Sequence, residues 1–101
     1  MELAAYVTFE HGADGPDEAL EEGQSRFHSG QRLDWREEDI SGDEITFTAS
    51  TWVDDATYDT YEGAAEHVAQ LAWSDIRPGI RADVAVYGNG DRALYHQSGV
   101  S

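Results

Sequence analysis

The sequence predicts an α+β fold in which two helices cover one face of an antiparallel sheet of about five strands. Three observations support this prediction. Residues 3–9 and 44–53 alternate between apolar and polar side chains, as half-buried strands do. Residues 61–76 carry apolar side chains at the spacing of a helix. The dipeptide Asn89-Gly90 is the strongest short signal for a hairpin turn.

The first helix is predicted to follow the strand over residues 3–9. Pro16 suits the first position of a helix, and Asp17 and Glu18 then lie near its positive end, where carboxylates are favoured. The apolar stripe continues to about His28, and Gly30 is a plausible stop. We therefore expect a helix over residues 16–28.

A hairpin is expected next. Residues 31–38 are predicted to form its first strand, with Leu33 and Trp35 on one face. The turn signal Ser41-Gly42-Asp43 follows, and residues 44–53 form the second strand, which is rich in β-branched residues.

The second helix is predicted from its cap and its stripe. Asp59 can cap it, and Glu62 stands three residues later, the spacing of a capping box. Pro78-Gly79 ends it. Two strands, 82–87 and 92–96, then flank the Asn-Gly turn. The stripe comprises Tyr61, Ala64, Ala65, Val68, Leu71, Ala72 and Ile76.

This order, β-α-β-β-α-β-β, is compatible with a ferredoxin-like (split βαβ) arrangement to which the last strand adds an extra edge. The chain shows no internal boundary, so residues 1–101 are expected to form one small acidic domain. The expected buried core comprises Val7, Phe9, Leu20, Phe27, Ile45, Phe47, Val68, Leu71, Val84 and Val86.

Charge is the feature that bears most on function. The 101 residues contain 21 Asp and Glu against six Arg and no Lys, which gives a formal net charge of −15. Repulsion among these like charges opposes compaction of the chain, so the benefit of the charge imbalance must lie outside the fold. Two explanations stay open: the surface binds a basic site that normally holds nucleic acid, or it keeps the protein dissolved in strong salt.

The acids of the first helix and of residues 34–66 are predicted to form one negative surface that imitates a phosphate backbone. Two tryptophans are expected to point away from the apolar faces of their helix and strand, and they are candidate apolar anchors beside this negative surface. The alternative is that each tryptophan packs against the terminal hairpin or a second copy of the chain. The candidate binding residues are Asp17, Glu18, Glu21, Glu22, Asp34, Glu37, Glu38, Asp39, Asp43, Glu44, Trp52, Asp54, Asp55, Asp59, Glu62, Glu66 and Trp73.

Other chemistry has weaker support in the sequence. There are no cysteines, and the four histidines show no i, i+4 pair of a helical zinc site, so no metal or cofactor is expected. Asp83 and His96 are expected to face each other across the last hairpin, as a structural ion pair or a general-base pair. No nucleophile stands near them in sequence, and no catalytic residue is assigned.

In composition and size the chain is similar to the small acidic inhibitors that phages make against restriction or CRISPR nucleases, and also to haloarchaeal domains. We therefore expect a non-enzymatic, cytoplasmic inhibitor whose partner is a basic nucleic-acid-binding protein, with neither nucleic acid nor membrane bound directly. The alternatives are a salt-adapted accessory domain, which can be a homodimer through its sheet, and a small α+β ligand-binding domain or enzyme.

Overall fold

The computed structural model describes residues 1–54, 56–58, 60–88 and 92–101. The strands form one antiparallel sheet in the order β2-β3-β1-β4-β5. The predicted α+β class and element order are confirmed. Along the chain the elements are β1 (Glu2–Glu10), α1 (Pro16–Gln24), β2 (Arg36–Ser41), β3 (Glu44–Trp52), α2 (Tyr61–Asp75), β4 (Arg81–Tyr87) and β5 (Ala93–Val100).

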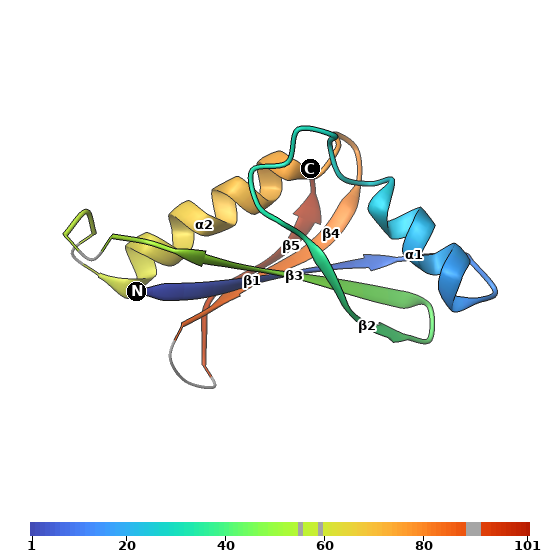
Figure 1. Ribbon diagram of the computed structural model, residues 1–101, viewed down its shortest axis with the longest axis horizontal. Helices are drawn as coiled ribbons and strands as arrows, with labels where there is room; N and C mark the ends of the chain where they lie inside the picture. The colour runs from blue at the N-terminus through green and yellow to red at the C-terminus, as the bar shows by residue number, and fades with distance from the viewer. Residues whose placement is uncertain (55, 59, 89–91) are drawn as a thin grey trace.

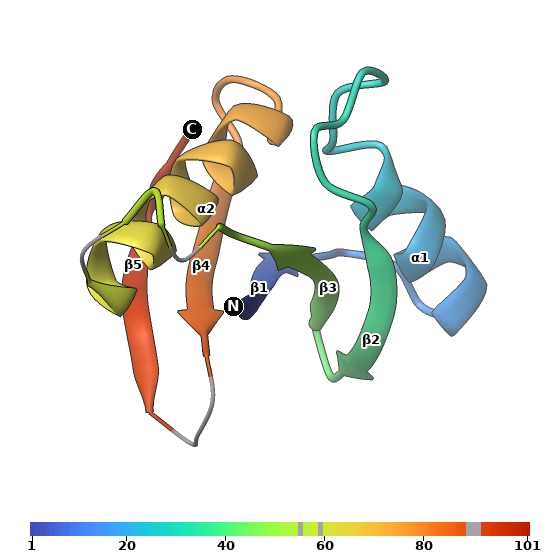
Figure 2. The same cartoon turned by 60° about the vertical axis from the view of Figure 1, so that its left-hand side comes forward.

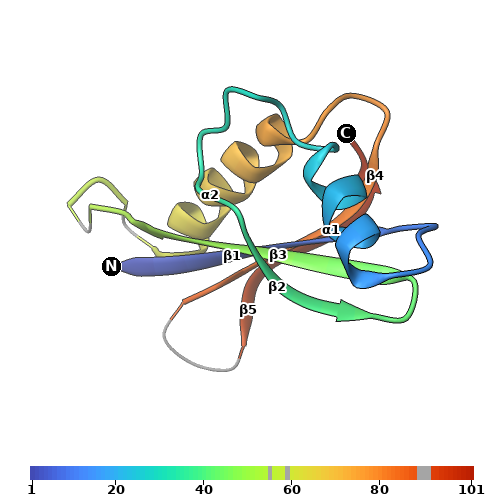
Figure 3. The ribbon, with the colours of Figure 1, turned by 45° about the vertical axis from the view of Figure 1, so that its right-hand side comes forward.

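The first four strands have the order of a split βαβ fold, and β5 is the extra edge beside β4. Both helices lie on the same side of the sheet (Figures 1 and 3). The helix α1 packs on β2 and β3, whereas α2 packs on β4, β5 and β1 (Figure 2). Within the described residues, no helix covers the other face of the sheet.

The core lies between the helices and the sheet. Two predicted core residues, Leu20 and Leu71, are only half-buried at its border. Tyr61 was predicted in the apolar stripe of α2, but its side chain is 54% exposed at the first turn of that helix. The other predicted core residues are buried, namely Val7, Phe9, Phe27, Ile45, Phe47, Val68, Val84 and Val86.

An aromatic cluster fills the core beneath the segment that follows α1. The Phe27 ring lies 5.3 Å from the Phe9 ring and 5.2 Å from the Phe47 ring, both edge-on, and it stacks on Trp35 at 5.2 Å. Gly23 of α1 lies directly over Phe47, where a Cβ atom would come within 2.7 Å of the ring. The absence of a side chain at this position allows α1 to approach the sheet.

The prediction for residues 16–38 was wrong in two places. The first helix ends at Gln24 rather than near His28, because the backbone of Phe27 pairs with Ile76 in an isolated antiparallel bridge. The strand expected over 31–38 runs instead over Arg36–Ser41, with a bulge between Glu37 and Asp39. Both changes follow from contacts with the end of α2.

Asp75 makes the contact that displaces the strand. Its carboxylate is 1% exposed and accepts hydrogen bonds from the amides of Arg32 (2.7 Å) and Leu33 (2.9 Å) and from Trp35 Nε1 (2.9 Å). A buried carboxylate needs such donors. The segment before β2 therefore bends across the end of α2 as a loop (Figure 3), and Leu33 still reaches the core.

The ends of α2 also differ from the prediction. Thr60 occupies the N-cap position, and its hydroxyl accepts a hydrogen bond from the Gly63 amide at 3.0 Å. Asp59, the predicted cap, lies outside the described residues. The helix ends at Asp75, and Gly79, with φ of 83°, forms the turn into β4. The predicted turn at Asn89-Gly90 also lies outside the described residues.

Candidate acidic interface and the open face of the sheet

The acids of α1 and of the first hairpin come together at one end of the molecule. Packing of α1 on β2 and β3 brings these two segments into contact. All of these acids are exposed except Glu22, which is half-buried. We call this group the acidic end. It comprises Asp17, Glu18, Glu21 and Glu22 of α1 with Glu37, Glu38, Asp39, Asp43 and Glu44 of the hairpin.

The arginines near the acidic end have partners already. Arg26 pairs with Glu22 at 2.9 Å, donates a second hydrogen bond to the Glu10 carbonyl oxygen and lies 5.5 Å from the centre of the Phe9 ring. Arg36, the first residue of β2, pairs with Asp34 at 3.0 Å on the exposed surface. Most of the negative charge of the acidic end is therefore left unneutralised by these arginines.

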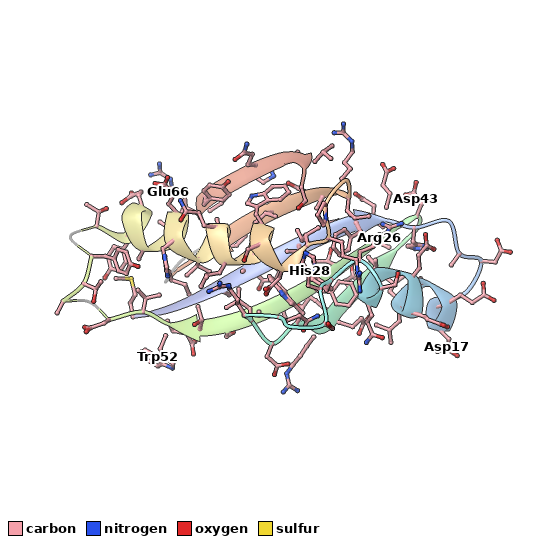
Figure 4. The ribbon with its side chains drawn as sticks, turned by 90° about the horizontal axis from the view of Figure 1, so that it is seen from above. Asp17, Arg26, His28, Asp43, Trp52 and Glu66 are labelled. Atoms are coloured by element: carbon pink, nitrogen blue, oxygen red, sulfur yellow. The ribbon has the colours of Figure 1, made fainter. Side chains whose placement is uncertain are left out.

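The remaining predicted acids lie elsewhere. The molecule is 45 Å long, and Asp17 and Asp43 lie toward one end of it, whereas Glu66 and Trp52 lie toward the other (Figure 4). Asp54, Glu62 and Glu66 are exposed around the start of α2, and Asp55 and Asp59 lie outside the described residues. The surface predicted as continuous therefore consists of two groups of acids.

The two candidate tryptophans have different environments. Trp52 is 76% exposed at the end of β3, opposite Glu2 on the face of the sheet without helices. Trp73 is half-buried, and its Nε1 donates a hydrogen bond to the Tyr95 hydroxyl at 3.2 Å. It thus packs against the terminal hairpin, the alternative that the sequence left open for it.

The open face of the sheet holds a shallow hollow of about 630 Å³. Small residues of three strands form its floor, and Tyr6 and Tyr87 meet edge-on in it with ring centres 5.5 Å apart. Its lining residues are Ala4, Tyr6, Thr8, Asp83, Ala85, Tyr87, Gly88, Ala93 and His96.

The expected contact between Asp83 and His96 is present in this hollow. His96 Nε2 lies 2.7 Å from Asp83 Oδ1, and the Ser98 hydroxyl donates to the same oxygen at 3.0 Å. The two residues are diagonal rather than opposite, because Asp83 pairs with Ser98 and His96 pairs with Ala85. The carboxylate therefore has two partners on β5.

The carboxylates do not converge on a cation site. Among the described residues, no three His, Asp or Glu side chains lie close enough to hold a metal ion. None of the helices in the described ranges is long and apolar enough to cross a membrane. The acidic end is thus a set of separate charges spread over two elements.

Sequence reasoning missed two polar residues. Asp75 was counted only as one acid among many, and its spacing gives no sign of its three donors. His11 was considered only as one of four histidines without zinc-site spacing, but its side chain is 9% exposed and its Nδ1 accepts a hydrogen bond from the Ala13 amide at 3.3 Å. Both positions also depend on distant segments, since Asp75 holds residues 32–35 and the His11 amide donates to the Asp43 carbonyl at 2.7 Å.

Comparison with known proteins gave no relative: no family model, no curated protein and no solved structure matches the chain.

Proposed function

We propose that the protein is a non-enzymatic acidic inhibitor that occupies a basic nucleic-acid-binding surface of another protein, in the manner of small phage inhibitors of restriction or CRISPR nucleases. The observation that supports it is the joining of α1 to the first hairpin. Two segments separated in sequence bring nine carboxylates to one end of a domain only 27 Å by 21 Å across.

The arrangement of these charges suits a phosphate-like role. Phosphates along a nucleic acid are separate, exposed charges, and a basic groove reads them largely through Coulomb attraction. The carboxylates of the acidic end are likewise exposed and do not gather around a cation site within the described residues. Such a surface raises the rate of encounter with a basic partner and repels nucleic acid itself.

The uneven distribution of charge supports an interface over a uniform coat. From residue 10 to residue 44 the sequence contains twelve acids and three arginines, whereas from residue 79 onward it contains two acids and two arginines. Arg81 lies at the border of the acidic end, in a shallow hollow with Glu10 and Arg26. Its charge should make that border the weakest part of the contact.

The experiment compares two variants of equal net charge. The first, Glu18→Gln/Glu21→Gln/Glu38→Gln, neutralises three exposed acids of the acidic end. The matched control, Glu2→Gln/Glu62→Gln/Glu66→Gln, neutralises three exposed acids elsewhere. Each is added to a panel of restriction and RNA-guided nucleases, and displacement of a labelled DNA duplex is measured together with cleavage.

We expect the wild-type protein and the control to displace DNA from at least one nuclease, and the first variant to lose this ability. The inhibition should weaken as salt rises, since screening reduces attraction between exposed charges. Equal loss in both variants would contradict the assignment to the acidic end. Failure to displace DNA from any nuclease of the panel would contradict the proposal for these target classes.

The hollow on the open face of the sheet favours a second candidate function, the binding of a small ligand. Its volume of about 630 Å³ is in the usual range of ligand sites. The rings of Tyr6 and Tyr87 beside the Asp83 carboxylate suit an aromatic organic cation.

This candidate is tested with a fluorescent aromatic cation as probe. Saturable binding of one probe per chain is expected, and Ala85→Leu should abolish it by filling the hollow. Ser50→Leu, on the same face but outside the lining, is the control. Non-saturable binding of the probe that is equal in the two variants would reflect attraction to the net negative charge of the protein, and it would argue against a ligand site.

A further inference from the structure

The two edges of the sheet differ in the protection they carry. The edge strand β2 (Arg36–Ser41) has four charged residues in six and a bulge between Glu37 and Asp39. The other edge strand, β5 (Ala93–Val100), contains no Asp, Glu, Lys or Arg. A register shift opposite Val86 and Tyr87 affects only its first residues, and from Tyr95 to Val100 it pairs with β4 in unbroken register. Natural sheets usually protect an edge with charge, proline or a bulge, because a bare edge pairs with other strands.

The outer edge of β5 has regular backbone groups available for such pairing. The Ser101 amide donates to the Ile80 carbonyl at 2.9 Å, which continues the register of the β4–β5 pair. Because successive residues of a regular strand turn their backbone groups to opposite edges, the groups of His96, Ser98 and Val100 point away from β4. In the described part of the chain, no strand pairs with that side.

A hollow of about 440 Å³ lies beside this edge on the helical side of the sheet. Trp73 and Ser74 of α2 line it together with Gln97, Gly99 and the last two residues. A Cβ atom at Gly99 would lie 4.0 Å from the Trp73 ring, an ordinary contact distance, so the glycine leaves this side of the ring without that contact. An added strand can therefore place a side chain in this hollow, as β-augmentation requires.

We propose that β5 pairs antiparallel with β5 of a second copy of this chain, about a twofold axis at Gln97, to form a continuous ten-stranded sheet. This register spans Leu94 to Val100 and forms its hydrogen bonds between His96 and Ser98 of opposite copies. It also places Tyr95 of the partner subunit beside Gly99 and the hollow under Trp73. An aromatic side chain opposite a strand glycine is a favourable cross-strand pair.

Charge favours a second copy as the occupant of this edge. Two chains of net charge −15 repel each other, so they associate best where their acids are farthest apart. Pairing through β5 puts the two β2 strands at opposite edges of the ten strands, about 40 Å apart by the usual strand spacing. This separation is several Debye lengths at physiological salt, so repulsion between the two acidic ends is largely screened.

The first test measures the mass of the full chain in solution by light scattering and sedimentation. A dimer of about 22 kDa is expected from the 11.2 kDa chain. Val100 is 56% exposed, so Val100→Lys should leave the fold intact. It should weaken the dimer about tenfold or more, because it places a charged side chain on the pairing edge, opposite Leu94 of the partner subunit. The matched control Ser41→Lys, on the other edge strand, should leave the dimer unchanged.

The second test uses the absence of cysteine from the chain. A Gln97→Cys variant should form a disulfide-linked dimer under mild oxidation, because a residue opposite itself in a non-hydrogen-bonded pair has its Cα atoms about 4.5 Å apart. Ser41→Cys is the control and should stay unlinked.

Four results would overturn the proposal. The first is a monomer at all micromolar concentrations, and the second is a dimer that Ser41→Lys breaks and Val100→Lys does not. The third is cross-linking through residue 41 rather than residue 97. The fourth is a monomer whose β5 edge binds an extended peptide of another protein, because the occupant is then not a second copy. None of these results depends on inhibition of a nuclease, so this proposal and the proposed function stand or fall separately.

Discussion

The acidic end and the side of the molecule formed by α2, β4 and β5 (the α2 side) are held together by different means. The helix α2 has 15 residues and packs along three strands, whereas α1 has nine residues and packs on two. The buried residues of α1 are Ala19 and Gly23. Those of α2 are Ala64, Ala65, Val68, Ala69, Ala72 and Asp75.

This difference shows where a small domain can tolerate a high density of charge. Small apolar residues let α2 lie close to the sheet and supply much of the buried helix surface. The acidic end contributes little helix surface to the core, and its side chains stay in water, where like charges are screened. Charge is thus densest where packing of a helix on the sheet is least extensive.

Phe47→Ala should have the largest effect, a loss of about 3–5 kcal/mol in the free energy of unfolding. Its ring is 1% exposed and contacts Phe9 and Phe27, so truncation removes burial and leaves a cavity. Chemical denaturation monitored by circular dichroism measures it. Tyr61→Ala, at an exposed position, is the control and should change stability little. A near-neutral Phe47→Ala would mean that the strands under α1 do not share one core.

Asp75→Ala should cost about 3 kcal/mol, because three donors lose their acceptor and buried donors without partners are expensive. The effect should be local as well as global. Hydrogen exchange at the amides of Arg32 and Leu33 should become faster by a larger factor than exchange in β4. If both regions respond equally, Asp75 does not specifically join the α2 side to the loop before β2.

Leu71→Ala should cost about 2 kcal/mol, at the low end for a leucine, because this side chain is only half-buried at the border of the core. Thermal unfolding, compared with that of Gln70→Ala on the exposed face of α2, measures the difference. A loss as large as that of Phe47→Ala would show that the α2 side depends on this border more than its burial indicates.

Gly23→Ala should cost about 1–3 kcal/mol, because the new Cβ meets the rigid Phe47 ring at 2.7 Å and pushes α1 outward. Gly30→Ala is the control, since a Cβ there meets nothing within 4 Å. Both are compared by denaturation and by binding to the nuclease panel. An unchanged stability would indicate that α1 is held more loosely than this contact implies.

Neutralising the acidic end should have the smallest effect on folding. The Glu18→Gln/Glu21→Gln/Glu38→Gln variant is expected to gain about 1 kcal/mol or less in dilute buffer, and the gain should vanish in strong salt. Unfolding is followed at both salt concentrations. A wild-type protein that folds only in strong salt would favour the salt-adapted domain over the inhibitor.

The sequence was sufficient for most of the fold because its local patterns agreed with one another. The alternation in residues 3–9 and 44–53 predicted β1 and β3, two of the three interior strands, and the turn at Gly42 is confirmed by its φ of 59°. The stripe of α2 predicted its buried face apart from Tyr61, which is exposed, and Leu71, which is half-buried. Period and turn chemistry are local properties, so they can be read without knowing the partners of each element.

What the sequence could not supply depended on distant partners. The β2 boundaries followed from the carboxylate of Asp75, which contacts residues some 40 positions away in the chain. The division of the acids into two groups depended on which strands α1 covers, since local spacing does not say where a helix packs. The sequence by itself determined the amount of charge, the elements and the core. Only tertiary packing decided where that charge gathers and which edge of the sheet is left bare, because both depend on contacts between segments far apart in the chain.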